Sequence, residues 1–178
     1  MQNICQELAK EINGDITKKS DLSRLLYLEA CLKEKLRLHP SGPLLLPHRA
    51  VEICEVMGYT IPKDSQIIVN MWAIAQDPKI WDDPLKFKPE RFLSSGLDYL
   101  GGNFAYIPFG SGRGFCTGQP LASRVVPRII ASLVYHFEWT LRGNMDPTRI
   151  DMSDKFDVTM LKEKPLCVIP KLRRPFIN

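Results

Sequence analysis

The spacing of apolar side chains predicts two helices near the start of the chain and a third one later. Apolar residues recur at every fourth position over residues 4–12, which predicts an amphipathic helix that ends at Gly14. Four leucines keep helical spacing over residues 22–39, and Pro40 ends this second helix because a proline disfavours helical geometry at the residue before it. Residues 121–137 are apolar enough to predict a mostly buried helix.

The segments between these helices lack helical periodicity. Short β-prone stretches separated by prolines predict a small sheet, in which residues 67–70 read as a buried strand. Residues 71–115 are rich in tryptophan, proline and glycine, which predicts a long meandering coil. The fold class is therefore mainly α with a small irregular β region, in one domain or part of one. Its expected segments are helices (1–40), a sheet region (41–70), a meander with a cysteine loop (71–118), a helix (119–138) and C-terminal strands and loops (139–178).

Composition narrows the class of protein without identifying it. Hydrophobic residues make up 44% and charged residues 25% of the 178 residues, as in ordinary soluble globular chains. The net charge of +4 is a mild excess, and no basic cluster is interleaved with aromatic residues, so we expect no nucleic-acid partner. No apolar run approaches about 20 residues, so we expect no transmembrane segment in this chain.

The cysteines and histidines do not form a familiar metal or disulfide pattern. The five cysteines are odd in number, far apart and without a C-x-x-C pair, which argues against a zinc module or a disulfide framework. The three histidines show no H-E-x-x-H spacing.

One cysteine lies in a distinctive loop. Residues 109–118 read FGSGRGFCTG, so that four glycines surround Cys116. Glycines allow tight turns, in which backbone N–H groups can point at a sulfur and stabilise its thiolate form. A single soft thiolate in an apolar loop suits an axial ligand of haem iron better than zinc. The alternative is a glycine-rich turn that holds a buried cysteine, because free cysteines are often buried.

Charged residues on the second helix and in the meander form a second candidate cluster. Glu34 and Arg37 are three residues apart and share a helix face, a spacing that by itself is typical of a surface salt bridge. Residues 87–92 read FKPERF, where apolar neighbours suggest that Arg91 is partly buried and needs a carboxylate or carbonyl partner. Arg91 is therefore a candidate third member of a network with Glu34 and Arg37.

Taken in order, these segments resemble the C-terminal part of a cytochrome P-450, a haem-thiolate monooxygenase. EKLR at 34–37 resembles the E-x-x-R motif of the family, PERF at 89–92 its P-E-R-F element, and FGSGRGFCTG at 109–118 its F-x-x-G-x-R-x-C-x-G loop. The sequences LPHR at 46–49 and MSDKF at 152–156 are similar to those of plant microsomal members. The resemblance covers essentially the whole chain.

The resemblance implies a role for each candidate residue. It implies that Cys116 is the proximal thiolate ligand of haem (iron protoporphyrin IX) and that Phe109 packs near its sulfur. His48 falls at a common position for a haem-propionate partner, and the neighbouring Arg49 is an alternative. The remaining three residues, Glu34, Arg37 and Arg91, are implied to hold the coil that presents the cysteine.

The chain departs from the family pattern in three ways. Gly114 stands where the family has the arginine that pairs with a propionate, and Arg113 beside it is a candidate substitute. Pro127 lies inside the helix after the cysteine loop and is expected to kink it. Nothing in the chain matches the membrane anchor or the long distal helix that precede these motifs in the family.

Three functions remain open from the sequence. The resemblance implies a monooxygenase of plant secondary metabolism that hydroxylates a lipophilic small molecule with electrons from NADPH-cytochrome P-450 reductase. It implies that a full-length parent is held at the cytoplasmic face of the endoplasmic reticulum membrane by an N-terminal anchor. The alternatives are a truncated, inactive product that binds haem weakly or not at all, and a small haem-sensing module that uses Cys116 alone.

Overall fold

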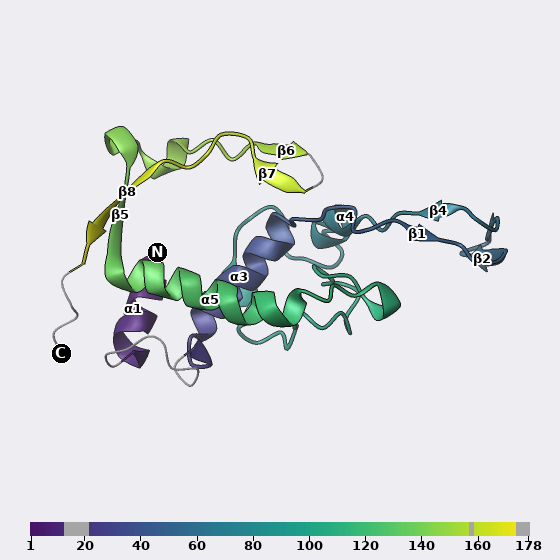
Figure 1. Ribbon diagram of the computed structural model, residues 1–178, viewed down its shortest axis with the longest axis horizontal. Helices are drawn as coiled ribbons and strands as arrows, with labels where there is room; N and C mark the ends of the chain where they lie inside the picture. Colours follow the sequence, from purple (N-terminus) through teal and green to yellow (C-terminus); the bar gives the residue numbers. More distant parts are fainter. Residues whose placement is uncertain (13–21, 157–158, 174–178) are drawn as a thin grey trace.

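The computed structural model of the chain describes residues 1–12, 22–156 and 159–173 (Figure 1). Its α-helices are α1 (Gln2–Glu11), α3 (Leu26–Leu38), α4 (Met71–Ala75) and α5 (Gln119–His136). Short 3-10 turns lie at η1 (Pro89–Phe92), η2 (Gly112–Gly114), η3 (Arg142–Asn144) and η4 (Pro147–Arg149).

The second predicted helix begins later than its apolar spacing indicates. α3 starts at Leu26, because Leu25 has a non-helical backbone (φ −82°, ψ 65°). The carboxylate of Glu7 on α1 accepts the backbone N–H groups of Tyr27 at 2.6 Å and Leu28 at 2.9 Å. These N–H groups have no partner within their own helix, and a carboxylate stabilises the positive end of a helix. The start of α3 is thus fixed from α1, which local spacing does not reveal.

The strands form four separate two-stranded antiparallel sheets in the described part of the chain. The pairs are β1 (His48–Arg49) with β4 (Gln66–Ile67), β2 (Cys54–Val56) with β3 (Tyr59–Ile61), β5 (Phe137–Leu141) with β8 (Val168–Leu172), and β6 (Asp154–Phe156) with β7 (Met160–Lys162). The expected buried strand at 67–70 is wrong, since β4 ends at Ile67 and the side chain of Ile68 is exposed. The first two sheets form an arm that extends beyond α4 (Figure 1).

The buried apolar residues form two clusters. One lies among α1, α3 and α5 and consists of Leu8, Ile12, Leu25, Leu28, Ala131 and Val134. The other joins α3 and α4 to the meander and consists of Ala30, Met71, Ala75, Trp81, Phe92, Tyr106 and Ile107. The meander therefore has its own core, and the short helix α4 within it was missed from sequence. Its start is capped by Asn70, whose side chain accepts the N–H of Ala73 at 2.9 Å.

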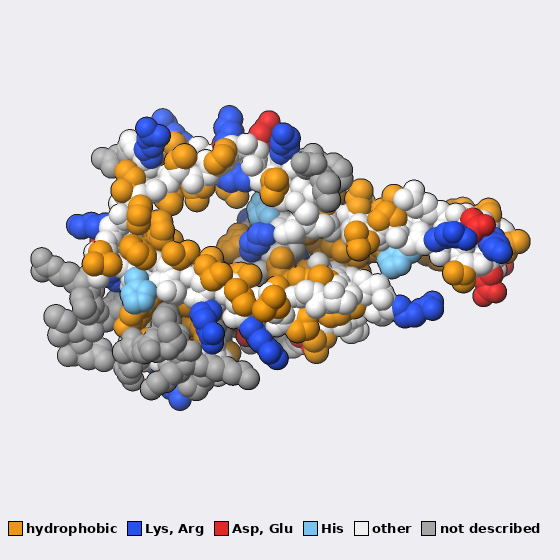
Figure 2. Space-filling view, viewed as in Figure 1, with side chains coloured by type: hydrophobic (Ala, Val, Ile, Leu, Met, Phe, Trp, Pro, Cys, Tyr) orange, Lys and Arg blue, Asp and Glu red, His pale blue; other side chains and the backbone are white. Residues whose placement is uncertain are grey.

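The helix after the cysteine loop is less buried than its composition predicts. Of the residues of α5, only Gln119, Ala131 and Val134 are buried, and hydrophobic side chains gather on its surface in Figure 2. The helix continues through Pro127 as one element. In the part of the chain that the structure describes, no helix has the length and apolar character needed to span a bilayer.

Candidate haem-thiolate site

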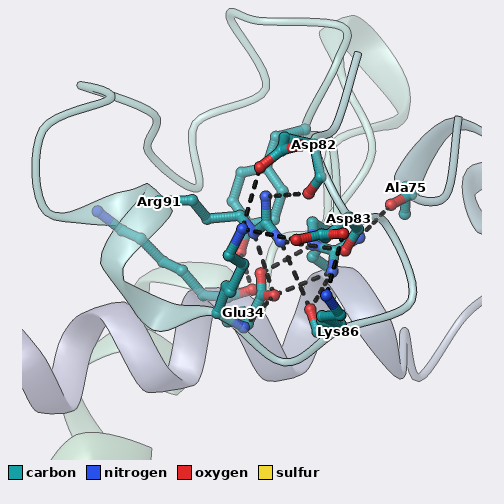
Figure 3. A network of polar contacts seen from close by, with 10 residues as sticks. Glu34, Ala75, Asp82, Asp83, Lys86 and Arg91 are labelled. Carbon is teal, nitrogen blue, oxygen red and sulfur yellow. Dashed lines mark hydrogen bonds and ion pairs between the residues drawn. The ribbon is translucent and has the colours of Figure 1, made fainter. Parts of the chain in front are cut away.

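A buried ion network joins α3 to the meander (Figure 3). Arg37 donates from Nε to Glu34 Oε2 at 2.8 Å and from Nη2 to Glu34 Oε1 at 2.9 Å, a bidentate pair in which both side chains are 0% exposed. Arg91 Nε donates to Glu34 Oε1 at 3.1 Å, and the backbone N–H of Lys88 donates to the same oxygen at 2.8 Å. The structure thus brings together the three charged residues that the sequence indicated. Because the Glu34–Arg37 pair is buried, it is not the surface salt bridge that the spacing alone suggests.

The two arginines use their remaining N–H groups to hold the coil between α4 and η1. Arg37 donates to the carbonyls of Ala75 at 2.5 Å and Lys86 at 3.3 Å, and Arg91 donates to the carbonyl of Asp82 at 2.9 Å. These carbonyl partners, labelled in Figure 3, lie far from Glu34 in sequence. Because buried guanidinium groups need hydrogen-bond partners, the coil and the network stabilise each other.

Aromatic side chains connect this network to the cysteine loop. The Trp81 ring lies 5.2 Å from the Arg37 guanidinium carbon, and the Phe92 and Tyr106 ring centroids are 5.0 Å apart. Tyr106 donates its hydroxyl to the Lys33 carbonyl at 2.9 Å, and its burial raises the pKa of the phenol, so the hydroxyl stays protonated. Tyr99 contacts Tyr106 and, at 6.0 Å between ring centroids, Phe109. Apart from the aromatic content of the meander, nothing in the sequence indicates this connection.

The loop that carries Cys116 is closed by its own backbone. The Cys116 N–H donates to the Phe109 carbonyl at 2.9 Å, and Gly110 turns the chain with φ +78°, a conformation that favours glycine. The Cys116 carbonyl accepts the N–H of Gln119, the first residue of α5, at 3.2 Å. Within the described residues, no backbone N–H donates to the Cys116 sulfur, contrary to the donor arrangement expected from the glycines. The side chain is exposed, so the buried-cysteine alternative does not hold either.

His48 lies against this loop, and Arg49 does not. A Cβ atom built on Gly114 would lie 2.6 Å from His48 Cε1, so the imidazole fills the space that any side chain at 114 would need. Arg49 instead pairs with Asp64 through a 2.6 Å contact between Nη2 and Oδ1. Neighbouring residues of a strand point to opposite faces, so only one of the two can face the loop. Arg113 is exposed at the loop surface.

An apolar pocket of about 410 Å³ lies between α3 and α5 beside the loop. Leu36 lines it from α3, Val126 and Ile130 line it from α5, and Phe109 joins it to the cysteine loop. The described residues contain no group of three or more His, Cys, Asp or Glu side chains that would hold an ion directly. A loop that carries an exposed thiol, adjoins an apolar pocket through Phe109 and has an imidazole against Gly114 fits a flat apolar group that carries its own metal and carboxylates.

Comparison with known proteins identifies similar chains. The family model for cytochrome P450 matches residues 1–169. The chain is 54% identical over 167 residues to the probable (S)-N-methylcoclaurine 3'-hydroxylase isozyme 2 of Coptis japonica, which covers 94% of this chain and 34% of that protein. It is 51% identical over 161 residues to the geraniol 8-hydroxylase of Swertia mussotii, covering 90% of this chain and 32% of that one.

A solved structure of a zebrafish cytochrome P450 with abiraterone has a similar backbone. The TM-score is 0.82 at 30% sequence identity, and the match covers 97% of this chain and 39% of the zebrafish chain. This chain therefore spans about a third of the length of the relatives that it matches.

Proposed function

This chain belongs to the cytochrome P450 family, and we propose that it forms the haem-binding part of a monooxygenase in which Cys116 is the thiolate ligand of the iron. The observation that carries this proposal is the position of Cys116, exposed in a glycine-rich loop that adjoins an apolar pocket and rests on the buried Glu34 network. When bound, haem would supply the iron centre at which oxygen chemistry takes place.

The residues of this chain would prepare the site rather than perform the oxidation. Cys116 would give the iron an anionic sulfur ligand, which donates electron density to the metal. Phe109, which lines the pocket beside the loop, would limit water access on the side of the sulfur. Glu34, Arg37 and Arg91 would keep the meander, and through it the loop, in one position.

We propose His48 as the principal partner of a haem carboxylate, with Arg113 as a second one. Arg49 is a weaker candidate because it is paired with Asp64. Gly114 then has a steric role, since it leaves room for the His48 ring.

The substrate class is proposed from the relatives. Their names describe hydroxylases of (S)-N-methylcoclaurine and geraniol, so we propose a lipophilic small molecule of plant secondary metabolism. Insertion of one oxygen atom from O₂ into a C–H bond, with the second atom leaving as water, requires two electrons and two protons. We propose NADPH-cytochrome P450 reductase as the electron donor and the endoplasmic reticulum membrane as the location of a full-length protein.

A second candidate is that the 178 residues alone are catalytically inactive. This candidate is favoured by the coverage of the relatives. The proteins named as hydroxylases are about three times as long as the segment that matches this chain. Haem addition, reduction and exposure to carbon monoxide separate binding from activity. We expect a strongly red-shifted Soret band, which reports thiolate ligation, whatever the turnover. The absence of this band would favour an inert product.

The contact between Gly114 and His48 gives a further prediction. We expect Gly114→Ala to weaken haem retention about as much as His48→Ala, by about tenfold or more, because hydrogen bonds to charged groups contribute about 1.5–3 kcal/mol. In a His48→Ala background, Gly114→Ala should have little additional effect, since the clash at 2.6 Å is gone. Haem titrations followed by absorbance measure all four combinations. Additive losses would show that the two residues act independently.

A further inference from the structure

The structure contains a second pocket, which the haem proposal does not use. It has a volume of about 430 Å³ and lies between the start of α3, the meander and α5. Leu25 and Leu28, which are 2% and 1% exposed, give it an apolar floor, and Tyr99 adds an aromatic ring. Small-molecule sites are concave, mostly apolar and about 300–1,000 Å³ in volume. The pocket therefore has the size and the floor of a site for an organic molecule.

The first residue of α5 adds a buried polar group to this pocket, which we call the Gln119 pocket. Gln119 lines it and is only 5% exposed. Among the described residues, no group forms a hydrogen bond with its side-chain carboxamide. Nearly all buried polar groups in proteins have a hydrogen-bond partner, and a carboxamide can both donate and accept. The free carboxamide indicates a ligand that brings a polar group to the floor of the pocket.

Two basic side chains on α5 also line the Gln119 pocket. Arg124 and Arg128 are four residues apart and therefore share one face of the helix. No carboxylate in the described part of the chain forms an ion pair with either guanidinium group. Guanidinium groups bind carboxylates through two parallel hydrogen bonds. These arginines are therefore available to an anionic group of a ligand.

The two acidic residues that line the pocket already have partners. Glu29 pairs with Lys33 Nζ at 3.0 Å, so its charge is balanced. Asp98 Oδ1 accepts the backbone N–H of Leu100 at 2.8 Å. The positive side chains of the pocket lack partners and the negative ones have them, which favours an anionic ligand over a cationic one.

We propose that the Gln119 pocket binds an aromatic carboxylate that carries a hydroxyl group at its opposite end. Its flat apolar body lies on the floor beside Tyr99, and its carboxylate accepts hydrogen bonds from Arg124 and Arg128. Its hydroxyl donates to the Gln119 carboxamide oxygen. Gln119 and Arg124 are five residues apart, about 7.5 Å along the helix axis at 1.5 Å per residue, so one aromatic molecule can reach both.

A small molecule fits this pocket better than an acidic surface of a partner protein does. Such a surface could also pair with two exposed arginines. It would not reach a carboxamide that is 5% exposed, so it would leave Gln119 without a partner. The combination of a buried carboxamide and two available guanidinium groups is what favours the smaller ligand.

Calorimetric titration of the haem-free 178-residue chain with 6-hydroxy-2-naphthoate tests the proposal. We expect saturable 1:1 binding, which the double variant Arg124→Gln/Arg128→Gln weakens at least tenfold. The affinity for 2-naphthol, which lacks the carboxylate, should not change in this variant. Arg142→Gln/Arg149→Gln is the matched control, because it removes the same two charges from exposed positions in η3 and η4. This control should bind 6-hydroxy-2-naphthoate as the parent does.

A second variant tests the buried end of the site. Gln119→Leu has a side chain of similar size without the carboxamide, and we expect it to weaken 6-hydroxy-2-naphthoate about fivefold, the size of a neutral hydrogen bond. The same variant should bind 2-naphthoate, which lacks the hydroxyl, as well as the parent does. Equal losses for both probes would show a general disturbance of the helix start and would refute the assigned hydrogen bond.

Other outcomes would overturn the site as a whole. Absence of saturable binding would do so, and it is the result expected if the arginines serve an acidic protein surface instead. Equal loss in the two double-arginine variants would reduce the effect to net charge. Loss of binding in Val126→Asp would move the probe to the pocket beside the cysteine loop, which Val126 lines. Because no haem is present, these results do not depend on the role of Cys116.

Discussion

Replacing Glu34 by alanine is expected to destabilise the fold by about 3–5 kcal/mol, the cost of breaking a buried ion pair by removing one partner. Glu34 accepts from both Arg37 and Arg91, and Arg37 is 0% exposed, so the variant strands buried positive charge. Such a loss is a large part of the 5–15 kcal/mol that stabilises a typical domain. Urea unfolding of the chain, followed by tryptophan fluorescence, measures it, because Trp81 packs against both guanidinium groups.

Glu29→Ala is the matched control for this variant. Glu29 lies on the same helix and pairs with Lys33 at 3.0 Å, but its side chain is 46% exposed. Exposed pairs contribute about 0–1 kcal/mol, so the control should shift the unfolding midpoint only slightly. Similar shifts for the two variants would contradict a structural role for the buried pair.

Glu34→Ala also separates two of the functions that the sequence leaves open. In the family interpretation, loss of Glu34 frees the meander and with it the Cys116 loop, so haem binding should fall with stability. A haem-sensing module that uses Cys116 alone should keep its ligand when Glu34 is replaced. Glu34→Gln keeps the shape and one acceptor oxygen, and we expect it to lie between the parent and the alanine variant.

The family and the fold class were predictable because motifs at fixed separations along the chain identify both. The family is confirmed by the match over residues 1–169, and the mainly α fold with a small irregular β region by the similarity to the zebrafish structure. The partners of Arg37 were less predictable. Side-chain spacing pointed to Glu34, but the Ala75 and Lys86 carbonyls are backbone groups that leave no trace in residue type.

The expectations that proved wrong concern burial, which depends on how an element contacts the rest of the structure. Residues 121–137 and 67–70 are apolar, and apolar composition predicts buried elements. In the structure, Ile129 and Ile68 are about half exposed, because no other described segment covers them. The apolar residues of an element indicate that its surface packs against another surface. They do not indicate whether that other surface belongs to the same 178 residues.

The position of His48 shows a different limit. From sequence alone, Gly114 shows only that the arginine of the family is missing, which predicts weaker haem binding. The structure adds that the glycine allows the imidazole to approach the loop, at a distance where any Cβ would clash. The resemblance already named His48 as a candidate, but only the three-dimensional contact shows that its ring occupies the space of a side chain at position 114.

Replacing Cys116 by alanine is expected to abolish the thiolate spectrum completely, because no other described cysteine lies in the 109–118 loop. The variant keeps the backbone hydrogen bonds of the loop, from the 116 N–H to the Phe109 carbonyl and from Gln119 N–H to the 116 carbonyl. The apolar pocket is also unchanged, so some haem can still partition into it, but without an anionic sulfur ligand. The spectrum of the reduced, carbon-monoxide-treated protein should then lack its red-shifted Soret band.

Two further cysteines serve as controls for this variant. Cys54 and Cys167 are exposed, as Cys116 is, but they lie on the β-arm and near β8. Cys54→Ala and Cys167→Ala should both keep the red-shifted band, since both cysteines lie outside the 109–118 loop. Cys116→His tests the position itself, because an imidazole there should hold haem with a different spectrum. Retention of the parent band by Cys116→Ala, or its loss in either control, would assign the ligand to another residue.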